Sequence, residues 1–190
     1  SVEYKGSKNA RQIKVAPGVE ESAFTPGSEI FQSEDRGEPK RLTEQTGITL
    51  GSGTSSVNGF TWVNSEYNDS TGRYELYLDD PSKKVEIDPA EDNTNVALTN
   101  SEGRVLYVNA EGVSSEGKEL VNTEGTNDIF DTLITIRDIF KNEQNLETQK
   151  VVDIAEKSVD ALNEVNNKIL NSTTSIGMKV NFLDDLKSNL

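Results

Sequence analysis

The 190-residue chain carries a formal charge of −14 and contains neither Cys nor His. Nucleic acids and anionic membranes need a basic surface on their partner, so the acidity predicts that the chain binds neither. The missing residue types exclude disulfides, thiolate or imidazole metal sites, and histidine-based acid–base catalysis. With 33% hydrophobic residues and no apolar run of about 20, we expect an elongated or modular chain without a membrane span.

Residues 1–45 predict a β-hairpin and a linker that lead into a β domain. Residues 2–4 and 11–16 are expected to pair across a polar turn. A short turn or helical segment follows at residues 26–31, and its final Ile-Phe pair is expected to dock on the body of the protein. The charged residues 33–45 then predict a linker or a short surface helix.

Residues 46–124 predict a small β domain with antiparallel strands. The clearest hairpin joins residues 96–99 to residues 105–108 through a turn that contains Gly103. Residues 73–79 alternate between apolar and polar side chains, as expected of a half-buried strand. Further strands are expected at residues 60–63 and 84–87, and a weaker one at residues 120–121.

Residues 125–190 change to a helical period and predict an α-helical domain. Thr126 or Asn127 is expected to cap a first helix, which is apolar over residues 129–140. A second helix then runs from about residue 146 to residue 190. It would be about 65 Å long, against about 20 Å for the first. The predicted fold class is therefore α+β: a small antiparallel β domain plus an α-helical hairpin with one long coiled-coil-type helix.

The long helix carries an apolar repeat of seven residues, as in a coiled-coil seam. A shorter antiparallel helix can cover the first part of this seam but cannot reach the rest. An amphipathic helix needs its apolar face buried, so the distal part predicts partners from elsewhere in the full chain or from another copy. Polar residues interrupt the seam at Asn166 and Thr173, where the helix either curves away from its partners or fixes their register. The predicted bundle or assembly interface consists of Val152, Ala155, Val159, Leu162, Ile169, Ile176, Val180, Leu183 and Leu190.

Three other patterns can be explained either by ordinary structural roles or by a functional site. The acidic segments 79–80 and 88–92 could bind Ca²⁺, but turn residues at the edge of a sheet explain them better. The segment 51–56 is rich in Gly and Ser but lacks the Gly-Lys-Ser/Thr ending of a phosphate-binding loop. A carbohydrate-binding face or, more simply, cross-strand packing could explain the aromatic residues Trp62, Tyr67, Tyr74, Tyr77 and Tyr107.

Three segments, in this order, resemble the flagellin family, and within it the hook–filament junction proteins known as hook-associated protein 3. The entry into the β domain is similar over residues 1–32, and Asp128-Ile-Phe-Asp-Thr-Leu-Ile-Thr-Ile-Arg137 resembles the phrase that opens the C-terminal helical region. Residues 176–183 resemble a flagellin-family motif, matching it at Ile176, Gly177, Asn181 and Leu183. Met178 and Phe182 depart from that motif.

The resemblance implies a non-enzymatic subunit of the bacterial flagellum that works outside the cell, without a cofactor. It implies a ring of identical copies that joins the hook to the filament, with a neighbouring hook-associated protein, flagellin and a flagellar export chaperone as partners. Export would use the flagellar type III apparatus. The chain would be a fragment that lacks the N-terminal helices and the terminal polymerisation helices. Residues 46–124 would be the variable, surface-exposed β domain, and residues 125–190 would belong to the helical inner tube.

Three alternatives remain open from the sequence. A flagellin filament subunit shares the pattern of residues 176–183. A surface adhesin would bind glycans through Trp62 and the tyrosines of the β domain. A glycosidase would need a pair of carboxylates about 5–10 Å apart in a cleft.

Overall fold

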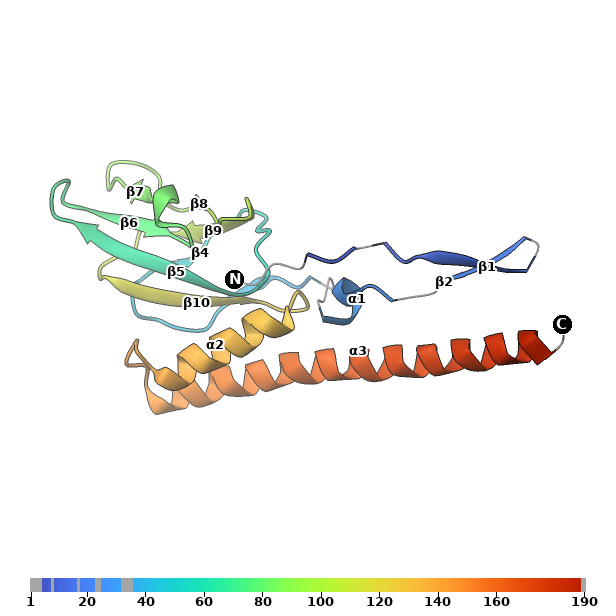
Figure 1. Ribbon diagram of the computed structural model, residues 1–190. Helices are drawn as coiled ribbons and strands as arrows, with labels where there is room; N and C mark the ends of the chain where they lie inside the picture. Colours follow the sequence, from blue (N-terminus) through green and yellow to red (C-terminus); the bar gives the residue numbers. More distant parts are fainter. Residues whose placement is uncertain (1–4, 8, 17, 23–24, 32–35, 189–190) are drawn as a thin grey trace.

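The computed structural model describes residues 5–7, 9–16, 18–22, 25–31 and 36–188. It combines three antiparallel sheets, one of them the two-stranded β1–β2 hairpin, with a helical hairpin, and this confirms the predicted α+β class (Figure 1). The elements are β1 (Gln12–Ala16), β2 (Val19–Ser22), α1 (Gly27–Phe31), β3 (Pro39–Arg41), β4 (Thr49–Leu50), β5 (Gly59–Asn68), β6 (Arg73–Tyr77), the 3₁₀ turn η1 (Pro81–Lys83), β7 (Val85–Ile87), β8 (Val96–Thr99), β9 (Val105–Asn109), β10 (Gly117–Thr123), α2 (Ile129–Lys141) and α3 (Thr148–Ser188).

The β domain is a small sandwich of a five-stranded sheet, in the order β3-β10-β5-β6-β7, and a three-stranded sheet, in the order β4-β9-β8. Apolar side chains from both sheets form its core, because they alternate along each strand and point to the shared face. The predicted hairpin is confirmed, with Val96 opposite Val108 and Thr99 opposite Val105. Gly103 takes a φ of +81° in the turn between these strands, a conformation that glycine adopts without strain.

The five-stranded sheet begins earlier in the chain than expected. Pro39–Arg41, which was predicted as part of a linker or short helix, forms the edge strand β3 and pairs with β10. The interior strand β10 is longer than the weak strand predicted at residues 120–121. A buried carboxylate, Glu119, explains part of this difference, because a polar residue at a core position hides the strand pattern.

The Glu119 side chain holds the segment before β4 against the sheet through hydrogen bonds. Its carboxylate accepts hydrogen bonds from the Thr43 hydroxyl at 2.7 Å, from the backbone N–H groups of Gln45 and Thr46 at 2.6 Å, and from the Thr46 hydroxyl at 3.0 Å. Every bond is charge-assisted, which offsets the cost of burying the carboxylate. The Gln45 side chain continues the link by donating to the carbonyl of Gln144 between α2 and α3.

Helix α2 and the first half of α3 lie against the outer face of the five-stranded sheet (Figure 1). Leu120 of β10 packs there with Ile139 of α2, Leu146 of the connection and Ile154 of α3. Helix α2 is capped by Asp128, whose side chain accepts from the backbone N–H groups of residues 130 and 131, so the predicted caps Thr126 and Asn127 are wrong. The Thr126 hydroxyl instead binds the backbone at the start of β5.

A tight turn built around Asn142 reverses the chain between α2 and α3. Asn142 ends α2 in the left-handed conformation, with a φ of 50°. Its side-chain amide accepts from the N–H of Leu146 at 2.7 Å and donates to the carbonyl of the same residue at 3.0 Å. The reciprocal pair fixes the antiparallel hairpin of helices that the sequence predicts.

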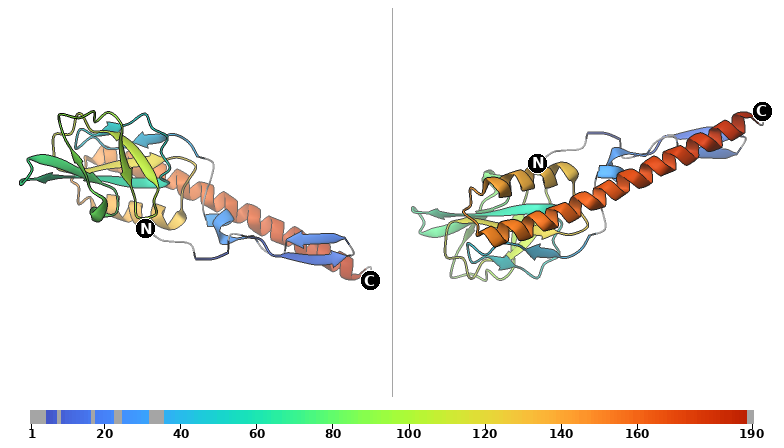
Figure 2. Two further views of the ribbon diagram at one scale, coloured as in Figure 1. Left: turned by 90° about the horizontal axis from the view of Figure 1, so that it is seen from above. Right: turned by 90° about the horizontal axis from the view of Figure 1, so that it is seen from below.

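The N-terminal segment differs from its prediction. Strand β1 pairs with β2, through a turn in which Gly18 has a φ of +77°, whereas the expected partner at residues 2–4 lies outside the described residues. The β1–β2 hairpin extends away from the sandwich and lies alongside the distal half of α3 (Figures 1 and 2). The chain is therefore elongated, with the sandwich at one end and the hairpin and helix α3 at the other.

Candidate assembly interface

Helix α3 uses one narrow face to pack inside the chain. The buried residues of α3 are Ile154, Ser158, Ala161 and Val165, and their spacings of four, three and four residues place them on one side of the helix. Ser158 satisfies its own buried hydroxyl by donating to the Ile154 carbonyl at 2.8 Å. Small side chains at Ser158 and Ala161 let the helix lie close to the rest of the hairpin and the sheet.

The first part of the predicted seam lies on a different flank of α3 from these buried residues. Val159, next to the fully buried Ser158, is 52% exposed, and Val152 is exposed as well. The prediction that α2 would cover the early heptads is therefore wrong at these positions, because the sheet and α2 contact the neighbouring face. Ala155, Leu162 and Ile169 are half-buried, and Leu190 lies outside the described residues.

The distal half of the seam also remains exposed. Val180 and Ile176 are each 52% exposed and Leu183 is 39% exposed. At about 1.5 Å per residue, α2 spans about 20 Å and α3 about 61 Å, so α2 ends long before these positions. We call Val152, Val159, Ile176, Val180 and Leu183 the exposed stripe, which winds gradually around α3 because a repeat of seven drifts by about 20° per heptad on a straight helix.

The N-terminal hairpin contacts another side of distal α3. The Lys179 ammonium donates to the Ser22 carbonyl at 3.0 Å and lies 3.7 Å from the Glu21 carboxylate. Asn166 and Thr173, the polar interruptions of the seam, are both exposed, and the Thr173 hydroxyl donates to Ile169 in its own helix. The hairpin thus occupies the flank around Lys179 and leaves the exposed stripe accessible.

Helix α2 adds further apolar side chains to the outer surface. Phe130, Leu133 and Phe140 are exposed. The Phe31 ring of α1 lies 6.3 Å from the Phe130 ring, so the end of the short helix packs against α2 as expected. Apolar side chains gathered in this number on a helical pair mark a surface suited to contact with other protein elements. Hydrophobic residues 129–140 were expected to face α3, whereas the buried positions of α2 are Thr132, Thr135 and Ile139.

The acidic segments act as turn caps. Asp80 accepts from the hydroxyl and the N–H of Ser82, and these bonds lower its pKa. Thr94 lowers the pKa of Asp92 in the same way. Asp88 forms an ion pair with Arg73 at 2.7 Å. Among the residues that the structure describes, no group of three or more carboxylates could hold a metal ion.

The Gly- and Ser-rich segment packs over strand β9. A Cβ at Gly53 would lie 2.3 Å from the ring of Tyr107, so only glycine fits there. Ser55 and Ser56 accept hydrogen bonds from the N–H groups of Tyr107 and Val105. The segment therefore covers the sheet and does not cradle a phosphate.

The aromatic residues are distributed over several places. Tyr67 and Tyr74 form a cross-strand pair with ring centroids 5.1 Å apart, as ordinary sheet packing predicts. Trp62 packs in the cluster between helices and sheet. Tyr77 donates to Glu66, which raises the pKa of Tyr77; the hydrogen bonds from Lys84 and then Tyr77 lower the pKa of Glu66.

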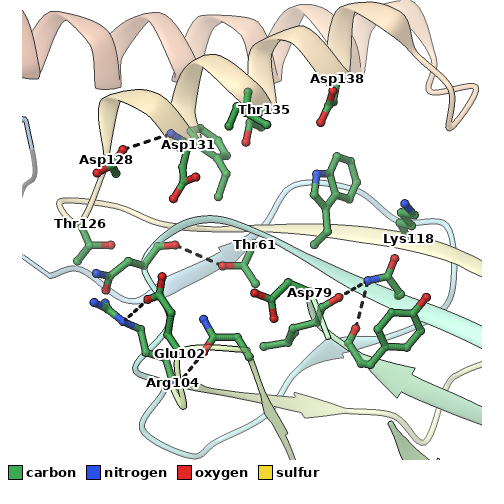
Figure 3. A pocket seen from close by; sticks show the side chains of 18 of the residues that line it. Thr61, Asp79, Glu102, Arg104, Lys118, Thr126, Asp128, Asp131, Thr135 and Asp138 are labelled. Carbon is green, nitrogen blue, oxygen red and sulfur yellow. Dashed lines mark hydrogen bonds and ion pairs between the residues drawn. The ribbon is translucent and has the colours of Figure 1, made fainter. Parts of the chain in front are cut away.

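A polar hollow of about 530 Å³ lies between α2 and the sheet (Figure 3). Asp131 and Asp138 face it from α2, Lys118 from β10, and Asp79 and Arg104 from the opposite side. Asp79 accepts from the N–H of residue 101 at 2.8 Å, and Arg104 pairs with Glu102 at 3.2 Å. Trp62 and Tyr77 also line the hollow, so it unites two of the five aromatic residues that the sequence singled out.

No protein-family model and no curated protein matches the chain. Among solved structures, FlgL from Xanthomonas campestris in space group H3 is similar over the whole chain, with 21% identity and a TM-score of 0.50. The chain shares the fold of FlgL. It covers 63% of that protein's length, and so spans less than two thirds of it.

Two further structures are similar with lower scores. The space group C2 form of the same FlgL has 21% identity and a TM-score of 0.49, over 99% of this chain and 62% of that one. The flagellar hook-associated protein 3 of Legionella pneumophila has 13% identity and a TM-score of 0.44, over 98% and 62%. In the described part of this chain, no helix is both long and apolar enough to cross a bilayer.

Proposed function

We propose that the chain is a non-enzymatic structural subunit of the bacterial flagellum that joins the hook to the filament. Two independent lines support the proposal: the sequence resemblance of residues 1–32, 128–137 and 176–183, and the shared fold with FlgL. In this proposal the subunit lies outside the cell, in a ring of copies next to another hook-associated protein and flagellin. A flagellar export chaperone and type III export are part of the same proposal.

The exposed stripe on α3 carries the proposal. It holds five aliphatic side chains on a helix of 41 residues, and three of them, Ile176, Val180 and Leu183, lie well beyond the reach of α2. Fully burying an aliphatic side chain contributes about 1.5–3 kcal/mol, so covering the exposed half of each would contribute about 1 kcal/mol. Such a gain favours helices from the same subunit or from neighbouring copies as the cover, with the β domain projecting outward.

Charge placed on the stripe tests this function. Leu183→Asp is expected to change the melting temperature of the 190-residue chain by less than about 2 °C, because surface substitutions typically cost within about 0.5 kcal/mol. In a strain that lacks the native gene, the full-length variant is expected to impair filament attachment and swimming.

Asn167→Asp, at an exposed position off the stripe, is the matched control and should leave motility unchanged. Normal motility of the Leu183→Asp strain would contradict the proposal. A large loss of melting temperature in the isolated chain would show instead that the stripe is already covered within these residues.

A flagellin filament subunit remains the second candidate, because the motif at residues 176–183 is shared with flagellins. The two functions predict different places in the flagellum. Immunogold labelling with an antibody against the β domain should mark the hook–filament boundary for a junction subunit. Labelling along the whole filament would favour flagellin.

A further inference from the structure

Asn58–Gly59 is the only Asn–Gly pair of the sequence, and it stands where β5 begins. Such pairs undergo a defined reaction without any oxidant or cofactor. The Gly nitrogen attacks Cγ of the Asn side chain, Nδ2 leaves as ammonia, and a five-membered succinimide forms. Water then opens the ring to aspartate or isoaspartate. Glycine favours the attack because it has no Cβ to hinder the approach.

The structure activates one of the two reacting groups, the Asn58 side chain, and blocks the other, the Gly59 nitrogen. The Arg36 guanidinium donates to Oδ1 of Asn58 and is itself fixed by the Val57 carbonyl at 2.8 Å and the Ser56 carbonyl at 2.9 Å. A cationic donor on Oδ1 withdraws electrons from Cγ, as donors to a developing oxyanion do. The half-buried amide of Asn58 also lines the polar hollow, where water reaches it. The electrophile is therefore activated and accessible.

The nucleophile, the Gly59 nitrogen, is by contrast held in a hydrogen bond. The Gly59 N–H donates to the Thr126 hydroxyl at 2.8 Å, and this bond is buried. The Thr126 hydroxyl in turn donates to the Thr123 carbonyl at 2.8 Å, so its orientation is fixed. The Gly59 nitrogen cannot attack while its proton is held in this bond.

We propose that Asn58–Gly59 is a latent deamidation site that the Thr126 hydroxyl keeps closed. Thr126 lies two residues before the cap of α2, so the site opens when this segment separates from β5. Isoaspartate would add an atom to the main chain at the start of β5, next to the carbonyl of residue 58 that accepts from Thr61. The modification would hold the start of α2 away from the sheet once it has separated.

Peptide mapping by mass spectrometry tests the proposal on the 190-residue chain incubated at neutral pH. Thr126→Val keeps the shape of the side chain but removes the acceptor, and deamidation of Asn58 should become at least about fivefold faster than in the native sequence. The control Thr135→Val removes another buried threonine hydroxyl beside the same hollow but leaves the Asn58 and Gly59 bonds intact, so its rate should be unchanged. The chain unfolded in guanidinium gives the upper limit of the Asn58 deamidation rate.

Equal rates in Thr126→Val and the native sequence would overturn the proposal, as would a folded native chain that deamidates as fast as the unfolded one. If Thr126→Val does not fold, amide hydrogen exchange of the native chain decides. The Gly59 amide should be protected together with the amides of the β5 ladder, and fast exchange at Gly59 alone would overturn the proposal.

Discussion

Nearly opposite faces of α3 should respond differently to the same kind of truncation. Ile154 is 1% exposed and lies in the cluster between helices and sheet, whereas Val152, two residues earlier, is 42% exposed. Both residues are aliphatic, and the heptad pattern assigns Val152, not Ile154, to the seam. Truncating each to Ala therefore distinguishes the observed packing face from the predicted one.

The expected difference in the free energy of unfolding is large. Ile154→Ala removes three carbons from a buried site, and at about 0.8 kcal/mol per methylene the transfer term is about 2.4 kcal/mol. A residual cavity raises this to about 3–4 kcal/mol, inside the usual range for such substitutions. For a chain of this size the melting temperature should fall by roughly 10 °C. Val152→Ala should cost less than about 1 kcal/mol, because much of its side chain already contacts water.

Urea unfolding followed by fluorescence measures this directly. Trp62 is the only tryptophan of the sequence and packs against the cluster that contains Ile154, so its emission reports the helix–sheet contact. Circular dichroism at the same urea concentrations follows the helices. Equal losses from Ile154→Ala and Val152→Ala would refute the reasoning, since they would mean that the stripe and the packing face are buried alike.

Further substitutions test the polar contacts. Glu119→Gln should lower the free energy of unfolding by about 1–3 kcal/mol, because the amide cannot accept from all four donors; an unchanged urea midpoint would contradict this. Asn142→Ala should cost about 2–3 kcal/mol and Asn142→Gly only about 1, since glycine tolerates the left-handed turn and only the side-chain bonds are lost; thermal melts should show that order. The folded-state pKa of Glu66 is lowered by Lys84, so this contact stabilises the fold above the ordinary glutamate pKa of about 4.3 and is lost as pH falls through the lowered value. Lys84→Met should therefore be less stable than the native sequence at pH 7 but not at pH 2, and a difference that persists in acid would oppose this assignment.

Local patterns predicted the parts of the fold that rest on apolar side chains. The hairpin of β8 and β9 follows from alternation around a turn with Gly103, and the structure pairs the same residues. The change to a helical period after residue 125 likewise predicted α2 and α3. In each case the hydrophobic pattern and the turn chemistry agree, so no distant contact was needed to choose the element.

Tertiary hydrogen bonds account for what the sequence did not predict. Strand β10 lies inside the sheet, yet Glu119 interrupts its apolar pattern because four distant donors satisfy that carboxylate. On α3, Ser158 lies on the packing face, where its hydroxyl donates to its own helix. Because Ser is polar, the apolar pattern of the sequence does not reveal that face. The exposed apolar residues form the more regular repeat, and they identify the surface left accessible rather than the one that is buried.

A unique thiol on the exposed stripe tests the central claim most directly. These 190 residues contain no Cys, and Val180 is 52% exposed, so Val180→Cys should react rapidly with a maleimide in the isolated 190-residue chain. In assembled flagella the reaction should slow by at least about tenfold, which corresponds to an interface that costs about 1.4 kcal/mol or more to open. Asn167→Cys, away from the stripe, provides the comparison. An unchanged rate for Val180→Cys in assembled flagella would contradict the claim that this stripe is an assembly interface.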